Sequence, residues 1–255
     1  MSDIEIDSQA LDYRIYVHKH FSKSDFDAWL LNSLHLSPDM KVLDAGCGVG
    51  RHMFDISGRV GKNGAVLGMD ISDDSLDKCR KNIEEWGAKN ISLVRADFAE
   101  IAEKVAERDF DRIVSSFAVY YTKNPQKTFK DLYDLLKPGG EVFICGPTPK
   151  NNSEFLDLVK RAGGSFSEDF LHWSNFLEHD ASDILRKLFK EVKTEYFNNP
   201  IEFPDADTLF KYWKATPLYN VLMENKMREL IAEEFKKKNT FISNKVIIGI
   251  TCKKL

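Results

Sequence analysis

Val42-Leu43-Asp44-Ala45-Gly46-Cys47-Gly48-Val49-Gly50 is the stretch that decides the fold of this chain. It begins as a short apolar run and ends in an acid followed by three glycines at alternate positions. This pattern is typical of a strand whose tip turns tightly into a helix, because glycine adopts positive φ and lets a ligand approach the bare backbone. The sequence therefore predicts a ligand site at the end of a first strand.

Strand-like and helical patterns alternate along the rest of the chain. Further apolar runs of strand length lie at residues 64–70, 91–95, 111–116, 141–146, 192–197 and 245–252. Helical patterns separate the first five strands, and Lys137-Pro138-Gly139-Gly140 is predicted as the turn before the fifth. Strands joined by helices of this length form parallel βαβ units, so the sequence predicts an α/β fold with a doubly wound sheet.

Composition limits the class of function. The chain has 255 residues, a net charge of −4 and 43% apolar residues, which is enough for a sizeable core but gives no basic surface for nucleic acid. Its four cysteines are scattered without a C-x-x-C pair, and its acidic N-terminus lacks the pattern of a signal peptide. No apolar run is long enough to cross a bilayer. We therefore expect a soluble, cytoplasmic protein without nucleic-acid partners, membrane insertion or a metal site.

Acidic and aromatic residues follow each of the next strands. Asp70-Ile71 ends the second strand, Asp97-Phe98 follows the third, and the segment from Ser115 to Tyr121 follows the fourth. Together with the glycine turn, and in this order, they resemble the motifs of the class I S-adenosylmethionine-dependent methyltransferases. The resemblance covers residues 24–146 well and the last strand loosely. It implies a seven-stranded, mostly parallel sheet with an antiparallel last strand and helices on both faces. The helical pattern and many aromatic residues of residues 147–240 predict an inserted cap in addition.

The nearest alternative is a nicotinamide or flavin dinucleotide site. Such a site has the pattern Gly-x-Gly-x-x-Gly and an acid about 20 residues on, and Asp70 stands at a compatible distance. Asp44 separates the two interpretations. Its carboxylate would repel a pyrophosphate, but it suits a ligand that carries an ammonium and a sulfonium group. S-adenosylmethionine carries both.

The resemblance assigns residues to the cofactor. Asp70 would accept hydrogen bonds from the ribose hydroxyls, Ile71 would contact the adenine, and Asp97 and Phe98 would bind the base. An N-terminal segment often covers the cofactor in this family, which points to Tyr16. The complete set of expected cofactor contacts is Tyr16, Asp44, Ala45, Gly46, Cys47, Gly48, Gly50, Asp70, Ile71, Ala96, Asp97, Phe98, Ser115, Ser116 and Phe117.

Methyl transfer from a sulfonium needs alignment of the acceptor and exclusion of water, and it needs a base only where the acceptor holds a proton. His172, beside Trp173 in the aromatic insertion, and Tyr120 are the candidate catalytic residues. We expect a small-molecule acceptor methylated at oxygen or nitrogen, and a monomer or homodimer. The alternatives are a protein or RNA acceptor and a non-catalytic cofactor-binding subunit.

Three segments are expected. Residues 1–146 form the cofactor-binding core with an N-terminal lid segment. Residues 147–240 form the substrate cap and the sixth strand, and residues 241–255 supply the final strand. Most of the aromatic residues of the cap are expected to form its own core, and a few to line an acceptor pocket.

Overall fold

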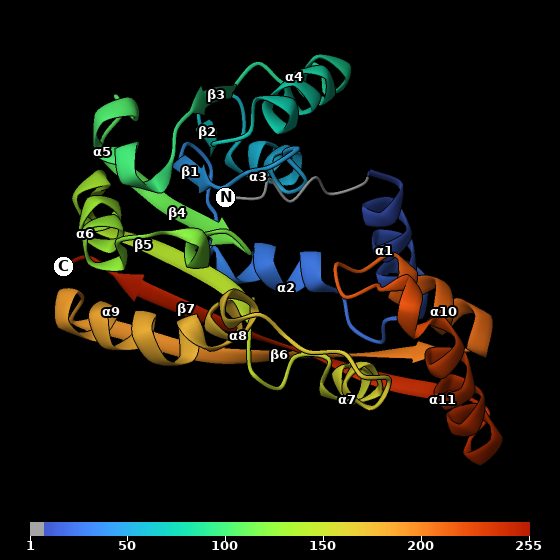
Figure 1. Cartoon of the computed structure of the whole chain (residues 1–255). Helices are drawn as coiled ribbons and strands as arrows, with labels where there is room; N and C mark the ends of the chain where they lie inside the picture. Colours follow the sequence, from blue (N-terminus) through green and yellow to red (C-terminus); the bar gives the residue numbers. More distant parts are fainter. Residues whose placement is uncertain (1–7) are drawn as a thin grey trace. The chain divides into compact units, whose positions relative to one another are not determined.

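A computed structural model describes residues 8–255 of the chain (Figure 1). The chain forms two compact units, each built from separate stretches. The first unit contains residues 8–25, Pro149–His172 and Asn198–Val246, and the second contains Phe26–Thr148, Trp173–Phe197 and Ile247–Leu255.

A seven-stranded sheet is the centre of the second unit (Figure 1). Its strands are β1 (Lys41–Ala45), β2 (Ala65–Asp70), β3 (Ile91–Arg95), β4 (Phe110–Ser116), β5 (Leu136–Pro147), β6 (Glu191–Phe203) and β7 (Phe241–Lys253). They lie in the order β3-β2-β1-β4-β5-β7-β6. β1 pairs in parallel with β2 and β4, and β7 runs antiparallel to β5. The expected sheet, with its antiparallel last strand, is confirmed.

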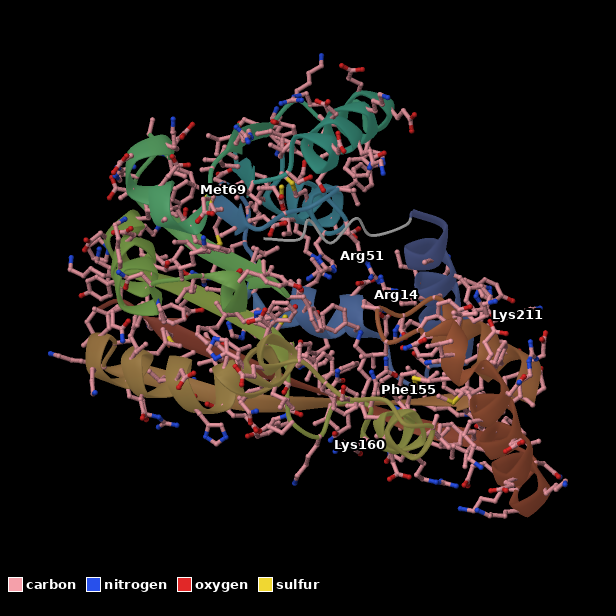
Figure 2. All side chains as sticks on the ribbon, viewed as in Figure 1. Arg14, Arg51, Met69, Phe155, Lys160 and Lys211 are labelled. Atoms are coloured by element: carbon pink, nitrogen blue, oxygen red, sulfur yellow. The ribbon has the colours of Figure 1, made fainter. Side chains whose placement is uncertain are left out.

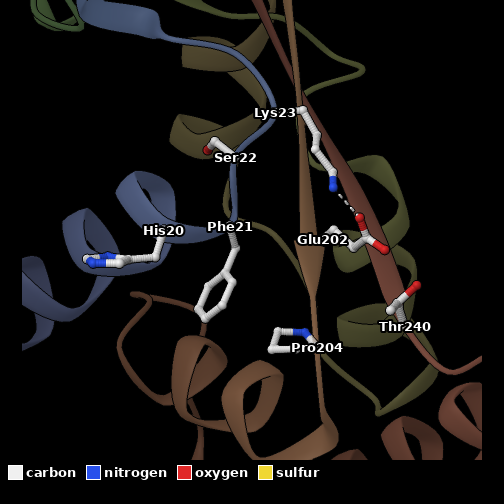
Figure 3. A pocket seen from close by; sticks show the side chains of 7 residues that line it. All are labelled: His20, Phe21, Ser22, Lys23, Glu202, Pro204 and Thr240. Carbon is white, nitrogen blue, oxygen red and sulfur yellow. Dashed lines mark ion pairs between the residues drawn. The ribbon is translucent and has the colours of Figure 1, made fainter.

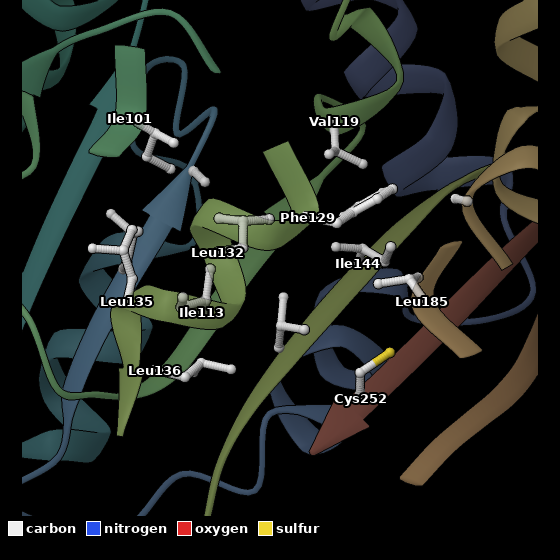
Figure 4. Close-up of a cluster of buried hydrophobic side chains, with 14 of the residues drawn as sticks. Ile101, Ile113, Val119, Phe129, Leu132, Leu135, Leu136, Ile144, Leu185 and Cys252 are labelled. Carbon is white, nitrogen blue, oxygen red and sulfur yellow. The ribbon is translucent and has the colours of Figure 1, made fainter. Parts of the chain in front are cut away.

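Alternate strand residues point to opposite sides of the sheet, and apolar residues lie on both sides. Helices therefore cover both faces. Val42, Val66 and Val114 pack in a cluster with residues of α2 (Phe26–Ser33), α3 (Met53–Val60) and α4 (Asp73–Trp86). Leu43, Leu67 and Ile113 belong to a second cluster with residues of α5 (Ile101–Lys104), α6 (Pro125–Leu135) and α9 (Ser182–Leu188) (Figure 4). The doubly wound arrangement leaves the carboxyl ends of the parallel strands free to carry the site.

Residues 137–140 differ from the sequence prediction. They were expected to form a turn, but the structure includes them in β5 as a bulge. Leu136 pairs with Phe110 and Glu141 with Arg112, so four residues of β5 lie opposite a single residue of β4. Gly139 has φ of +76°, and its amide donates a hydrogen bond of 2.8 Å to the carbonyl of Lys254. The glycine does bend the chain, but the backbone stays paired with its neighbours.

The first unit is mainly helical. It contains α1 (Ser8–Phe21), α7 (Ser153–Arg161), α10 (Ala206–Lys214) and α11 (Glu224–Lys237), together with ends of β6 and β7, and α8 (Glu168–Phe176) runs from it into the second unit. Trp213 and Phe203 are fully buried, so these aromatics of the insertion form a core, as expected. Among the described residues, no helix is both long and apolar enough to cross a bilayer.

Candidate active site

The turn after β1 has the geometry that its glycines predict. Gly46, Gly48 and Gly50 have φ of +86°, +54° and +81°. The amide of Gly46 donates a hydrogen bond of 2.7 Å to the carbonyl of Met69, which ties the turn to β2. A Cβ on Gly46 would lie 2.2 Å from the Cβ of Ala118. A side chain at this position would therefore displace the segment that follows β4.

Asp44 is a buried acid at the start of this turn. The residue is only 4% exposed, and none of the residues that the structure describes donates a hydrogen bond to its carboxylate. Burial, together with the charge of Asp70, raises the pKa of Asp44 to about 6, although the charge of His52 lowers it. Within the described part of the chain, Asp44 is thus a buried carboxylate that accepts no hydrogen bond, which fits a cationic ligand.

Asp27 fixes the first residues after the glycine turn. Its carboxylate lies 2.9 Å from Nε2 of His52 and accepts a hydrogen bond of 2.8 Å from Nη2 of Arg51. Although burial raises it, the hydrogen bonds from His52 and Arg51 lower the pKa of Asp27 to about 2. Sequence reasoning missed this contact, because Asp27 lies on α2 and nothing in its local pattern indicates a partner after β1.

Asp70 lies at the tip of β2, as expected, and it also organises the loops around it. Its two carboxylate oxygens accept hydrogen bonds from the amides of Gly48, at 2.8 Å, and of Ser72, at 2.9 Å. Each oxygen keeps a further lone pair for a ligand hydroxyl. Cys47, which lies between Gly46 and Gly48, is buried. A hydrogen bond to Cys79, together with burial, raises the pKa of the Cys47 thiol.

A cavity of about 460 Å³ opens between the tips of β2 and β3. It is lined by Ile71, Arg95, Ala96, Asp97, Ala99, Glu100 and Lys104. Ile71 is 56% exposed, and such an apolar side chain at a cavity can contact a planar ring. Asp97 accepts a hydrogen bond of 2.8 Å from the amide of Ala99, which fixes its orientation. The ring of Phe98, in the short helix η1 (Phe98–Glu100), comes within 3.8 Å of the place of a Cβ on Gly46. The structure therefore places Ile71 and Asp97 at this cavity and Phe98 beside the glycine turn, and their role at an adenine stays a prediction.

The segment after β4 packs against the glycine turn. Ser115 Oγ donates a hydrogen bond of 2.7 Å to the carbonyl of Ala45, and Ser116 Oγ accepts one of 3.4 Å from the thiol of Cys145. Phe117 has φ of +55°, an uncommon conformation for a residue with a side chain. The surrounding structure holds the backbone of Phe117 in this sharp bend, next to Ala118, whose Cβ lies 2.2 Å from the place of a Cβ on Gly46.

Tyr120 lies in the short helix η2 (Val119–Tyr121) and is 7% exposed. Burial raises the pKa of Tyr120 well above its usual value, and a hydrogen bond to Tyr121 adds to this shift. The hydroxyl therefore stays protonated at neutral pH, where it can donate a hydrogen bond but cannot act as a base.

Tyr16 and His172 belong to the first unit, whereas the residues above belong to the second. Tyr16 is 47% exposed on α1, and its ring packs on that of His20 with 4.2 Å between centroids. His172 is exposed on α8. Their roles at a cofactor or an acceptor stay predictions.

The first unit has a smaller hollow of about 180 Å³ (Figure 3). It is lined by His20, Phe21, Ser22, Lys23, Glu202, Pro204 and Thr240. Lys23 and Glu202 form an ion pair there with an N–O distance of 2.5 Å (Figure 3). Because its two opposite charges already neutralise each other, this hollow is a poorer candidate than the strand tips of the second unit.

The family described as "Methyltransferase domain" matches residues 36–208, which include every strand tip described above. The chain belongs to this family. It is 26% identical over 229 residues to the demethylmenaquinone methyltransferase of Lactococcus lactis, a match that covers 88% of this chain and 84% of the relative. It is 30% identical over 179 residues to the ubiquinone/menaquinone biosynthesis C-methyltransferase of Wigglesworthia glossinidia brevipalpis, which covers 64% of this chain and 70% of the relative.

A solved structure shares the fold of this methyltransferase. It is phosphoethanolamine N-methyltransferase 2 of Haemonchus contortus in complex with S-adenosyl-L-methionine, with a TM-score of 0.56 and 15% identity over 90% of this chain and 52% of the other. The present chain is an S-adenosylmethionine-dependent methyltransferase. The residues of the second unit fit this cofactor, because no described residue donates a hydrogen bond to the buried Asp44 and the space beside Gly48 is open.

Proposed function

We propose that this methyltransferase transfers a methyl group to a small organic acceptor. The observation that carries the cofactor site of this proposal is the buried carboxylate of Asp44 at the glycine turn, which accepts no hydrogen bond from the described residues and suits the cationic end of the cofactor. The two relatives named above, a demethylmenaquinone methyltransferase and a ubiquinone/menaquinone biosynthesis C-methyltransferase, support a small-molecule acceptor. Oxygen and nitrogen remain the expected acceptor atoms, and the C-methyltransferase relative adds carbon.

Each strand tip takes one part of the cofactor in this proposal. Asp44 attracts the ammonium group, while the amino-terminal end of the α3 dipole attracts the carboxylate at the same end of the cofactor. Asp70 accepts the ribose hydroxyls on its remaining lone pairs. Asp97, with Ile71 beside it, binds the adenine in the 460 Å³ cavity.

The bound cofactor supplies a methyl group on a sulfonium, which is already an activated leaving group. The chain's own part is to orient the acceptor in line with that group and to exclude water. Tyr120, held protonated, donates a hydrogen bond in this proposal. His172 is the proposed base for acceptors that hold a proton at neutral pH.

Two further proposals concern the whole protein. We propose a monomer or homodimer, which would act on its acceptor without a partner protein. We also propose a cytoplasmic location, supported by the four cysteines, all of which are free thiols.

Calorimetric titration with S-adenosylhomocysteine tests the cofactor site on which this proposal depends, with NAD as the control ligand. We expect micromolar binding of S-adenosylhomocysteine alone, and at least tenfold weaker binding by Asp44→Asn. Asp55→Asn, an exposed acid on α3, is the matched control and should bind as the unmodified protein does. Binding of NAD in place of S-adenosylhomocysteine would refute the proposal.

A further inference from the structure

Arg95 is a basic residue that lines the 460 Å³ cavity, and the expected cofactor contacts do not include it. It is the last residue of β3, which pairs in parallel with β2. Asp70 lies opposite Arg95 in this pairing, and Met69 lies opposite Val94 (Figure 2 labels Met69). Both strands therefore end at the same edge of the sheet, and the loop after β2 contributes Ile71 to the same cavity.

Two contacts hold the Arg95 side chain against the loop after β2. Its Nε donates a hydrogen bond of 3.3 Å to the carbonyl of Ile71 and lies 3.1 Å from a carboxylate oxygen of Asp73. The side chains of Arg95 and Asp73 are 61% and 65% exposed, and an ion pair so exposed stabilises a fold little. The main effect of these contacts is therefore to fix the position of the guanidinium beside the cavity.

Most of the guanidinium stays available to a ligand, because both contacts use Nε. Among the described residues, neither Nη group of Arg95 has a hydrogen-bond or ion-pair partner. A guanidinium is planar and weakly hydrated, and it stacks on the flat face of a ring whose π electrons attract its charge. Lys104 lines the same cavity, but no contact within the described part of the chain fixes its ammonium group. Arg95 is thus the positioned cation of this cavity.

We propose that Arg95 binds the adenine of S-adenosylmethionine, with the flat face of its guanidinium against the base. Asp97 accepts a hydrogen bond from the amino group at the edge of the base, so the faces of the base are left to Ile71 and Arg95. Asp73 is a positioning residue, because it acts on the base only through Arg95. The inference rests on the adenine site of the proposed function and adds to it a residue that favours a flat base.

Titration calorimetry with adenosine and with S-adenosylhomocysteine tests the proposal. Adenosine has the base and the ribose but lacks the amino-acid end, so its affinity does not depend on Asp44. Arg95→Met removes the plane and the charge of the side chain, and it should weaken the binding of both ligands by the same factor, about two- to fivefold. Arg80→Met is the matched control and should bind both as the unmodified protein does. Arg80 is similarly exposed and pairs with Asp77, but it does not line the cavity.

Asp73→Asn tests the positioning role. It should weaken adenosine binding when introduced alone and have no further effect in the Arg95→Met variant, because it acts through Arg95. A further loss in the double variant would contradict this role.

Asp97→Asn separates the inference from the proposed function. If Asp97→Asn weakens adenosine binding but Arg95→Met does not, the inference is overturned and the adenine site stands. If neither variant changes the affinity for adenosine, the base binds elsewhere, and the proposed adenine site falls together with the inference.

Discussion

Replacing Asp44 by asparagine should stabilise the ligand-free protein while weakening its cofactor binding. Burial, with the charge of Asp70, raises the pKa of Asp44 from 3.8 to about 6 against the effect of His52. Between these values the folded state binds more protons than the unfolded state, so the free energy of unfolding falls as pH rises. Above pH 6 the whole cost is present. Two pKa units correspond to about 3 kcal/mol. Asparagine has nearly the same shape and no charge, so it avoids this cost.

The assay is urea unfolding of the unmodified protein and of Asp44→Asn without ligand, at pH 7.5 and at pH 4.5. We expect the variant to be more stable by about 3 kcal/mol at pH 7.5, with the difference shrinking as pH falls toward 4. Asp55→Asn should show no such pH-dependent gain, because Asp55 is exposed. In the same variant, S-adenosylhomocysteine should lose about 1.5–3 kcal/mol of binding energy, as for other charged hydrogen bonds.

Lower stability of Asp44→Asn at pH 7.5 would refute this reasoning. It would mean that the carboxylate contributes to the fold, and that a partner stabilises its charge in solution. A stability gain that did not vary with pH would also contradict the argument, because the cost arises from ionisation alone.

Three further changes have expected outcomes. Gly46→Ala should abolish S-adenosylhomocysteine binding in calorimetry, because its Cβ would lie 2.2 Å from that of Ala118, whereas Gly48→Ala, with no heavy atom within 4 Å of the new Cβ, should bind measurably. Asp27→Asn should weaken cofactor binding several-fold. The pKa of Asp27 is lowered to about 2, so the ionised carboxylate stabilises the unmodified protein, and this contribution is lost as pH falls from 4 to 2. The Asp27→Asn variant should lack this contribution, which is about 1 kcal/mol for so exposed a pair, as measured by urea unfolding. Trp213→Ala should lower the free energy of unfolding by about 3–5 kcal/mol in the same assay, because the side chain is fully buried; a loss under 1 kcal/mol would contradict this packing.

The acids at the strand tips were predictable from sequence. Asp44, Asp70 and Asp97 each follow an apolar run, and a parallel sheet brings the carboxyl ends of its strands to one edge. Topology alone therefore places these side chains near one another. The hydrogen bonds of Asp70 to the amides of Gly48 and Ser72 were not predictable, because they depend on the conformation of two loops.

Contacts between distant segments account for the other differences. The interaction of Asp27 with His52 joins α2 to the start of α3, and neither residue stands in a motif. Residues 137–140 have the composition of a turn, yet the amide of Gly139 bonds to the carbonyl of Lys254, more than a hundred residues later. Local propensity correctly indicated a bend at Gly139. It did not indicate that the C-terminal strand would keep the bend within the sheet.

The buried acid at the glycine turn follows a physical rule. Asp44 is 4% exposed, and none of the described residues donates a hydrogen bond to its carboxylate. Such a group lowers the stability of the ligand-free protein, and a ligand of the opposite charge removes that cost when it binds. A cationic cofactor end would therefore bind where the fold already contains the matching charge. A group that only stabilised the fold would have its partner within the chain, as Asp27 has in His52 and Arg161 in Glu234.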